Sequence, residues 1–479
     1  MGTLAMQHVR RMRWILAQTS VVLGLLVGLA LSGPARSETL RDAMADAYTN
    51  SPLLDQNRFL LRVEDEGVAQ AVAQLRPVLT FLASANRDLV GNTTTTTASL
   101  VAEWTLYAGG SRRLSLEAAR ETVLATRQGL VSVEQQVLLD AATAYLNVWR
   151  DLQIVGAREA NVRVVNQQLR AARDRLELGE ITATEVAQAE TRLAEARASL
   201  ASAQGQLAIN RELFLLAVGR EPGRLSAPGA LPDLPASEAA ADDLARRNTP
   251  TILQLQHEVR VADLAVEGAR ASYRPTISLE GQYAETLQAP TPNAEDESAS
   301  IGLSLSVPIF AGGQLSSVER QAIAQASATR SALLQQVRVN VQIMGVAWSD
   351  SRIAGAQITS ARQRIASAEV ALEGVRQEAD LGVRTTLDVL DAEQDLLDAR
   401  INLIEAQASR FATAYSTVKI LPPSLSPERV KVDDFYAARS RLIPPLPWPT
   451  FAPPFSLGQW QRLCTAWVVA LARCRCGPR

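Results

Sequence analysis

The segment Gly382-Val-Arg-Thr-Thr-Leu-Asp-Val-Leu-Asp-Ala-Glu-Gln394 separates two long runs that are rich in alanine and free of proline. A glycine closes the first run, a short threonine-containing turn follows, and a second run begins. Glycine just past a periodic run is a common helix stop. A similar segment occurs in the first half of the chain, where Leu178-Gly179 is followed by Glu190. We therefore predict two helical hairpins, with Gly179 and Gly382 as hinges at their tips.

Threonines at both tips predict the start of the returning helices. The N-cap is Thr182 or Thr184 in the first hairpin, and Thr385 or Thr386 in the second. Hydroxyl side chains favour this position because they accept a hydrogen bond from a free backbone N–H. Glu185 and Asp388 then fall in the first turn, near the positive end of the helix dipole.

The chain carries an internal repeat. The matching landmarks are Asn50-Ser51-Pro52 with Asn248-Thr249-Pro250, Arg76-Pro77 with Arg274-Pro275, Tyr107-Ala-Gly-Gly110 with Phe310-Ala-Gly-Gly313, and Leu178-Gly179 with Leu381-Gly382. Self-similarity of this kind indicates repeated structural units. We predict two homologous halves, 38–221 and 236–421, joined by a Pro/Gly-rich linker at 222–235. Glycine pairs (Gly109 with Gly110, Gly312 with Gly313) mark the strand-to-helix turns.

Each half has the same predicted order of elements. A first helical stretch ends at an Arg-Pro pair, two alternating strands follow across a polar loop, and a long helix with a return helix completes the half. The predicted ranges are helices 39–75 and 238–273, strand pairs 78–88/97–107 and 276–286/299–309, loops 90–97 and 288–297, long helices 111–178 and 314–381, and return helices 184–217 and 386–420.

The four alternating segments are the basis for a membrane prediction. Alternation over about ten residues is typical of a membrane-spanning strand, although one such hairpin alone is also typical of a protein surface with one dry face. Four strands cannot close a barrel, and open strand edges are excluded from lipid. If the strands span a membrane, a trimer giving a 12-stranded barrel is the economical solution. The long helices, at 1.5 Å per residue, would extend it by ~100 Å as a coiled-coil barrel.

The composition excludes several functional classes. A net charge of -2 gives no signal for nucleic-acid binding. The two histidines are His8 and His257, and the three cysteines, Cys464, Cys474 and Cys476, all lie near the C-terminus. Hydrolase chemistry would have to recruit His257, so we predict a protein that is not an enzyme and has no metal site or cofactor.

The two terminal segments differ in composition from the rest of the chain. Residues 1–37 combine a basic start, an apolar stretch and small residues before Glu38, which predicts a secretory signal peptide; an uncleaved membrane anchor is the alternative. Residues 422–479 are rich in proline and predict a disordered tail. A Cys-x-Cys metal or redox site in this tail is the alternative.

The strand pairs and long helices in two halves, the Phe310-Ala-Gly-Gly313 turn and above all Gly382–Gln394 closely resemble the TolC family of outer-membrane export channels. The resemblance covers about residues 38–421, and the tip segment is most similar to members that serve type I secretion. It implies a homotrimeric channel with a β-barrel in the outer membrane and an α-helical barrel in the periplasm. The implied partners are outer-membrane lipid, a periplasmic adaptor (membrane fusion) protein, and an inner-membrane ABC or proton-driven transporter.

The resemblance also implies roles for tip residues. Asp388 and Asp391 match aspartates that ring the periplasmic entrance, and Arg384 matches an arginine that latches the inner coil to its neighbour. Thr184 and Glu185 match the partners of that arginine.

Residues at i and i+3 share one face of a helix, so three-fold symmetry would stack the two aspartates as rings that favour cations. One latch position departs from the family, because Ala379 stands where a tyrosine is expected. The closed state is then either held less firmly or held by Asp380 instead. The alternative function is a soluble periplasmic coiled-coil adaptor or scaffold, which explains the helices but not the strands. The transported substrate is not encoded in a readable motif.

Overall fold

The computed structural model of the chain describes residues 37–91, 93–232, 235, 237–288 and 297–420. The chain divides into two units, 1–425 and 426–479, and all the described residues belong to the first. The predicted signal peptide up to residue 36, the predicted tail from 422 onward and most of the polar loop at 288–297 lie outside the described residues.

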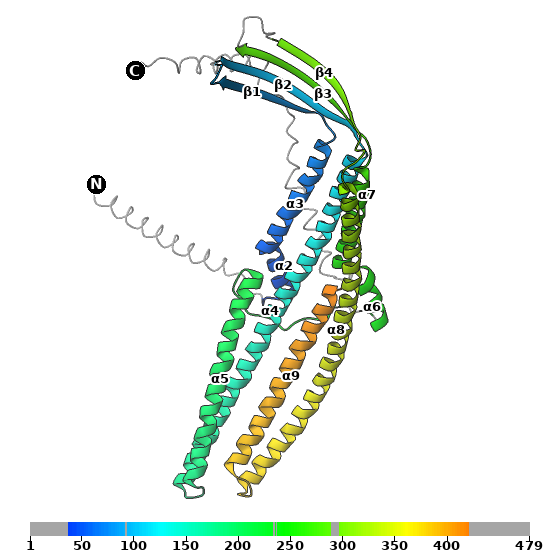
Figure 1. The fold of residues 1–479 in the computed structure, drawn as a ribbon. Helices are drawn as coiled ribbons and strands as arrows, with labels where there is room; N and C mark the ends of the chain where they lie inside the picture. Colours follow the sequence, from blue (N-terminus) through cyan, green and yellow to red (C-terminus); the bar gives the residue numbers. More distant parts are fainter. Residues whose placement is uncertain (1–36, 92, 233–234, 236, 289–296, 421–479) are drawn as a thin grey trace, which may run out of the picture. The chain divides into compact units, whose positions relative to one another are not determined.

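The described unit consists of eight helices and one four-stranded sheet (Figure 1). The helices are α2 (Leu40–Asn50), α3 (Pro52–Ala73), α4 (Ser111–Glu177), α5 (Ala183–Val218), α6 (Glu238–Arg247), α7 (Pro250–Ala271), α8 (Gln314–Asp380) and α9 (Thr386–Ile420). The strands are β1 (Val78–Asp88), β2 (Thr93–Ala108), β3 (Thr276–Gln288) and β4 (Glu297–Ser306). The two longest helices, α4 and α8, have 67 residues each.

The first helical stretch of each half is broken, so the prediction of single helices at 39–75 and 238–273 was wrong. Ser51 has extended backbone angles (φ −73°, ψ 113°) between α2 and α3, and Thr249 does the same (φ −75°, ψ 142°) between α6 and α7. In both places a proline follows, and its ring disfavours the helical conformation of the residue before it. Proline itself fits the first turn of the next helix, where its missing N–H costs nothing.

The sheet is antiparallel throughout, with the strand order β1-β2-β3-β4. β2 begins at Thr93, so the second half of the predicted loop at 90–97 is strand instead. Five consecutive threonines, Thr93 to Thr97, explain the difference because β-branched side chains favour extended backbone. β4 ends at Ser306 rather than 309, shortly before Pro308, whose nitrogen cannot donate to a strand ladder.

Paired glycines turn the chain from strand into helix. Gly109 and Gly110 have φ of 63° and 91°, and Gly312 and Gly313 have φ of 58° and 85°. Left-handed backbone of this kind is readily adopted only by glycine. The Arg274 side chain secures the first turn, because its Nη1 donates to the Gly109 carbonyl oxygen at 2.8 Å.

None of the helices in the described residues is long and apolar enough to cross a membrane.

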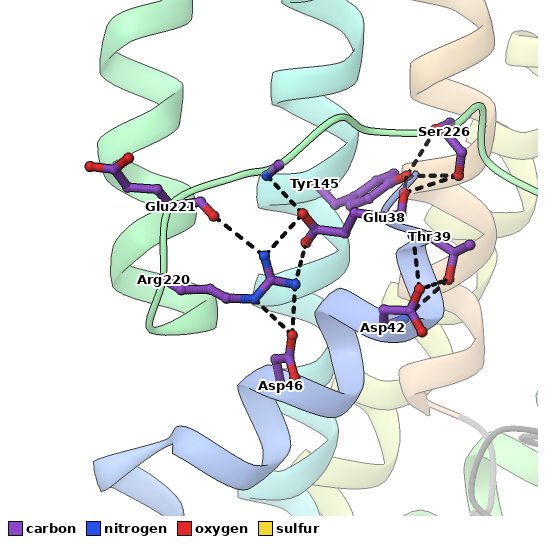
Figure 2. A network of polar contacts seen from close by, with 9 residues as sticks. Glu38, Thr39, Asp42, Asp46, Tyr145, Arg220, Glu221 and Ser226 are labelled. Atoms are coloured by element: carbon purple, nitrogen blue, oxygen red, sulfur yellow. Dashed lines mark hydrogen bonds and ion pairs between the residues drawn. The ribbon is translucent and has the colours of Figure 1, made fainter. Parts of the chain in front are cut away.

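The start of the described chain is held by a network of hydrogen bonds and ion pairs around Glu38, which we call the polar clamp (Figure 2). The Glu38 carboxylate is buried, and it accepts hydrogen bonds from Arg220 Nη2 at 2.9 Å and from the Gly223 N–H at 2.8 Å. Arg220 also forms an ion pair with Asp46 of α2 at 2.7 Å. These contacts tie the first described residues to the end of α5 and to the linker.

Tyr145 of α4 also belongs to the polar clamp, where it joins Glu38 to the linker residue Ser226. Its fully buried hydroxyl lies 2.9 Å from the Glu38 carbonyl oxygen and 2.8 Å from that of Ser226. Burial raises the pKa of this hydroxyl, so it stays a neutral hydrogen-bond donor. The linker segment next to α5 is therefore fixed onto α4.

Candidate functional site

The candidate site is formed by the tips of two helical hairpins, α4–α5 and α8–α9, which lie side by side in Figure 1. Each tip has a left-handed glycine, Gly179 or Gly382, with φ of 77° in both. The Glu180 N–H donates to the Arg175 carbonyl at 2.9 Å, and the Val383 N–H donates to the Glu378 carbonyl at 2.9 Å. This is the Schellman ending of a helix, which pairs carbonyl groups that the helix leaves free.

One threonine at each tip begins the return helix. Thr385 caps α9, since its hydroxyl accepts from the Asp388 N–H at 3.3 Å and its own N–H donates to the Asp388 carboxylate at 2.9 Å. Thr182 is the N-cap of α5, and its N–H donates to Glu185 at 3.5 Å. Thr184 is exposed within the first turn of α5.

Each hairpin also carries an ion pair between its two arms. Arg173 on α4 contacts Glu190 on α5 at 2.5 Å, and Arg376 on α8 contacts Glu393 on α9. The two pairs occupy matching positions in the two repeats. They join the two arms of each hairpin near its tip.

The two hairpins are packed together through Leu390 of α9. Leu390 is 4% exposed and belongs to an apolar cluster whose other members lie on α4 and α5. Those members are Val165, Leu169, Ala172, Val186, Ala189 and Leu193. The α8–α9 hairpin has its own cluster of Leu372, Val389 and Leu396, against which Ala379 packs. Ala379 therefore fills an apolar position here.

Two ion pairs cross from one hairpin to the other. Arg175 lies 3.4 Å from Asp380, and Arg192 lies 2.6 Å from Asp391. Both arginines belong to the first hairpin and both aspartates to the second. Their side chains are between 37% and 74% exposed, so water screens each pair and its contribution to stability is small.

Arg384 contacts its own hairpin in this chain. Its Nε lies 2.9 Å from the Glu378 carboxylate, and its Nη1 lies 4.0 Å from Asp388. The hydrogen bond to Glu378 raises the pKa of the guanidinium, which is charged at any physiological pH. The predicted contact from Arg384 to Glu185 is not formed within the chain, where Glu185 serves as a capping residue instead.

The two predicted entrance aspartates have different surroundings. Hydrogen bonds from the backbone and side chain of Thr385 lower the pKa of Asp388 below its ordinary value of 3.8, so it is ionised at neutral pH. Asp391 is half exposed and has a positive partner in Arg192. Across the described ranges, no cluster of His, Cys, Asp or Glu could hold a metal ion.

Sequence reasoning missed Arg175, Arg192 and Leu390. The internal repeat could have identified Arg173 and Arg376, because each stands at the same spacing from its hinge glycine. The cross-hairpin residues have no such signal, since their partners lie on another helix about which the linear spacing says nothing.

Comparisons with known proteins agree with this architecture. The family model described as outer membrane efflux protein matches residues 43–220 and 243–417. The outer membrane efflux protein BepC of Brucella suis is 35% identical over 400 residues, which make up 82% of this chain and 87% of that protein. TolC of Escherichia coli is 24% identical over 412 residues, covering 81% and 83% of the two chains.

Solved structures share the fold. The outer membrane protein VceC of Vibrio cholerae matches with a TM-score of 0.70 at 22% identity, over 80% of this chain and 95% of that one. The predicted resemblance to the TolC family is confirmed. The chain belongs to the outer membrane efflux protein family, and it is an export channel of the outer membrane.

Proposed function

We propose that three copies of this chain close one continuous export duct through the outer membrane and the periplasm. The observation that supports the trimer is the sheet, in which β1 and β4 each lack a neighbour on one side within the described residues. Unpaired backbone groups are not tolerated in lipid, and four strands are fewer than the eight of the smallest membrane barrels. Three copies would supply twelve strands and leave no open edge.

Side chains on the strands fit this proposal. Large apolar residues of the sheet are more than half exposed in the single chain. They include Leu79, Phe81, Ile301, Leu303 and Leu305. A soluble sheet would bury such a set against its own core, whereas lipid or a neighbouring copy would cover it in the assembled duct.

The proposed entrance is at the hairpin tips. Asp388 and Asp391 of three copies would ring the axis and favour cations, with Arg192 offsetting part of the charge of Asp391. The latch of Arg384 to Thr184 and Glu185 would form between neighbouring copies. It would require Arg384 to exchange its contact with Glu378 for one across the interface.

The proposed duct is passive and acts with other proteins. A periplasmic adaptor and an inner-membrane ABC or proton-driven transporter would supply the substrate and the energy, so the duct itself needs no catalytic group. Exposed apolar side chains at the tips, Leu178, Leu381 and Val383, offer a docking surface for the adaptor. The family match favours this function over the soluble adaptor or scaffold.

Planar bilayers test the duct and its entrance together. The purified protein should insert as an oligomer, form cation-selective channels, and lose selectivity when Asp388→Asn and Asp391→Asn are combined. Glu66→Gln is the control, because it removes one carboxylate from α3, far along the chain from both tips. A monomer without conductance would contradict the duct, and an unchanged reversal potential would contradict only the aspartate rings.

A further inference from the structure

The polar clamp binds a single residue, Glu38, through all of its polar atoms. The Glu38 N–H donates to the Arg224 carbonyl oxygen at 2.8 Å, and the Glu38 carbonyl oxygen accepts from the Ser226 N–H at 2.9 Å. The carboxylate accepts from Arg220 and from the Gly223 N–H, as Figure 2 shows. Every nitrogen and oxygen atom of Glu38 therefore has a partner in the described chain.

The linker between the repeats is shaped around this carboxylate. A Cβ atom at Gly223 would lie 3.2 Å from Glu38 Oε2, which is closer than such atoms normally approach. The glycine thus leaves the space that the carboxylate occupies. Gly219, with a left-handed φ of 86°, ends α5 directly before Arg220. Residues 219–226 therefore form a built binding site for one glutamate.

The contacts of the polar clamp begin abruptly at Glu38. Ser37 is exposed and makes no hydrogen bond or ion pair with another described residue, whereas Glu38 is 8% exposed. The sequence predicts the removal of residues 1–37, since small residues at 35 and 37 precede this point. The first residue that the fold binds is therefore the first residue of the predicted mature chain.

Two residues of the polar clamp are not repeated in the second half of the chain. Thr39 and Ser237 are the N-caps of the equivalent helices α2 and α6, and the residues before them are Glu38 and Ala236. Tyr145 and Trp348 stand at the same distance from the starts of α4 and α8. Alanine has no carboxylate and tryptophan has no hydroxyl. The clamp is thus a property of the start of the chain and not of the repeated fold.

The charges of the polar clamp favour one further cation. Glu38 and Asp46 share the guanidinium of Arg220, at 2.9 and 2.7 Å. Two carboxylates and one guanidinium leave one negative charge, and uncompensated charge is costly beside a buried group such as Glu38. An α-ammonium group at Glu38 would supply the missing positive charge, on the nitrogen that already donates to Arg224.

We propose that residues 219–226 are the receptor for the mature N-terminus, and that the polar clamp is completed when a signal peptidase hydrolyses the peptide bond between Ser37 and Glu38. Water supplies the oxygen of the new Ser37 carboxylate, and its two hydrogens go to the Glu38 nitrogen, which becomes an α-ammonium. This group stays at the Arg224 carbonyl oxygen, where its charge-assisted hydrogen bond is stronger than that of the uncut peptide.

The docked N-terminus would fasten the linker between the repeats. The Tyr145 hydroxyl lies within hydrogen-bond distance of the carbonyl oxygens of both Glu38 and Ser226. The N-terminus and the linker are therefore held together on α4, and this packing reaches full strength only after the signal peptide is removed. The inference goes beyond the export duct and does not depend on the number of copies.

Mass spectrometry and trypsin test the receptor in the full chain isolated from outer membranes. The intact mass should place the first residue at Glu38. Insertion of Gly-Ser between Ser37 and Glu38 keeps the Glu38 side chain but moves the α-ammonium away. Trypsin should then cut the exposed Arg224–Leu225 bond roughly tenfold faster, a factor typical of the loss of a hydrogen bond to a charged group. Cleavage after Arg247, at the end of α6, is the internal reference.

A second variant separates the side chain from the α-ammonium. Glu38→Gln should also accelerate the cut at Arg224, whereas Glu66→Gln on the exposed side of α3 should not. A mature chain that begins elsewhere, or wild-type cleavage in the insertion variant, would overturn the receptor. Equal acceleration at Arg224 and Arg247 would also overturn it, because the whole fold would then be loosened. If the insertion variant does not form conducting channels, the comparison of Glu38→Gln with Glu66→Gln decides.

Discussion

At the scale of single residues, the tip is defined by which charges have partners. Arg192 lies beside Asp391 and Arg175 beside Asp380, whereas Asp388 is held by Thr385 of its own turn. Exposed ion pairs of this type stabilise a fold by about 0–1 kcal/mol. We therefore expect these arginines to influence the local charge more than the stability of the helices.

Arg192→Gln should increase the cation selectivity of the channel. The substitution removes the positive partner of Asp391, so a full negative charge is left at the proposed entrance. Reversal potentials in a salt gradient measure the change. Arg197→Gln on the exposed face of the same helix is the control, and an equal shift in both variants would show that Asp391 is not involved.

The cap on α9 should be sensitive to acid. Because the pKa of Asp388 is lowered in the folded protein, its contribution to stability is fully present above pH 3.8 and is lost as the pH falls through the depressed pKa. Amide hydrogen exchange of residues 383–388, corrected for its intrinsic pH dependence, should show reduced protection only at that low pH. Thr385→Val should lose much of the protection at pH 7 as well, and equal protection in this variant would contradict the capping role.

At the scale of elements, the two hairpins are joined more by packing than by charge. Leu390 of α9 is almost fully buried among residues of α4 and α5. Removal of a buried leucine side chain costs about 2–5 kcal/mol, which exceeds the contribution of the two exposed ion pairs together. Leu390 therefore contributes more than the exposed ion pairs to holding the tip of the second hairpin against the first.

Leu390→Ala should loosen the contact between the hairpins and raise the open fraction of the channel. Single-channel recordings and hydrogen exchange of residues 386–396 would both detect the change. The matched control is Leu381→Ala, because Leu381 lies at the same tip but is 80% exposed. Indistinguishable behaviour of the two variants would show that Leu390 does not hold the hairpin.

At the scale of the whole molecule, the internal repeat makes one chain behave as two similar building blocks. The junction between the blocks, secured by Arg274 and Gly109, is formed inside the chain. In the internal repeat Arg76 corresponds to Arg274 and Gly312 to Gly109, and no described atom lies within 4 Å of a Cβ atom built at Gly312. A chain with one closed and one open junction is suited to assembly with copies of itself.

If Arg76 donates to a neighbouring copy in the proposed trimer, as Arg274 donates to Gly109 within the chain, Arg76→Ala should lower the temperature at which the oligomer dissociates in detergent. The circular dichroism of the folded protein should stay the same, since the side chain of Arg76 makes no hydrogen bond or ion pair with a described residue of its own chain. Unheated and heated samples on gels measure the dissociation. Arg274→Ala serves as a comparison that weakens the junction inside each copy, and a wild-type dissociation temperature for Arg76→Ala would contradict its role.

The sequence by itself determined the features that depend on neighbouring residues. The left-handed turns at Gly179 and Gly382 and the alternation in the strands follow from local backbone sterics and from the period of the side chains. The breaks before Pro52 and Pro250 belong to the same class, because proline restricts the residue before it, and the sequence analysis overlooked them.

Only the tertiary structure decided which residues meet between helices. The linear spacing predicts that Asp388 and Asp391 share a face, but not that Arg192 lies beside Asp391 or that Arg384 contacts Glu378. Helices as long as α4 and α8 can pack in many rotations and registers that differ little in local energy. The packing is selected by many contacts between residues that are far apart in the sequence, such as that of Leu390 with α4 and α5. These contacts cannot be read from any one segment of the sequence.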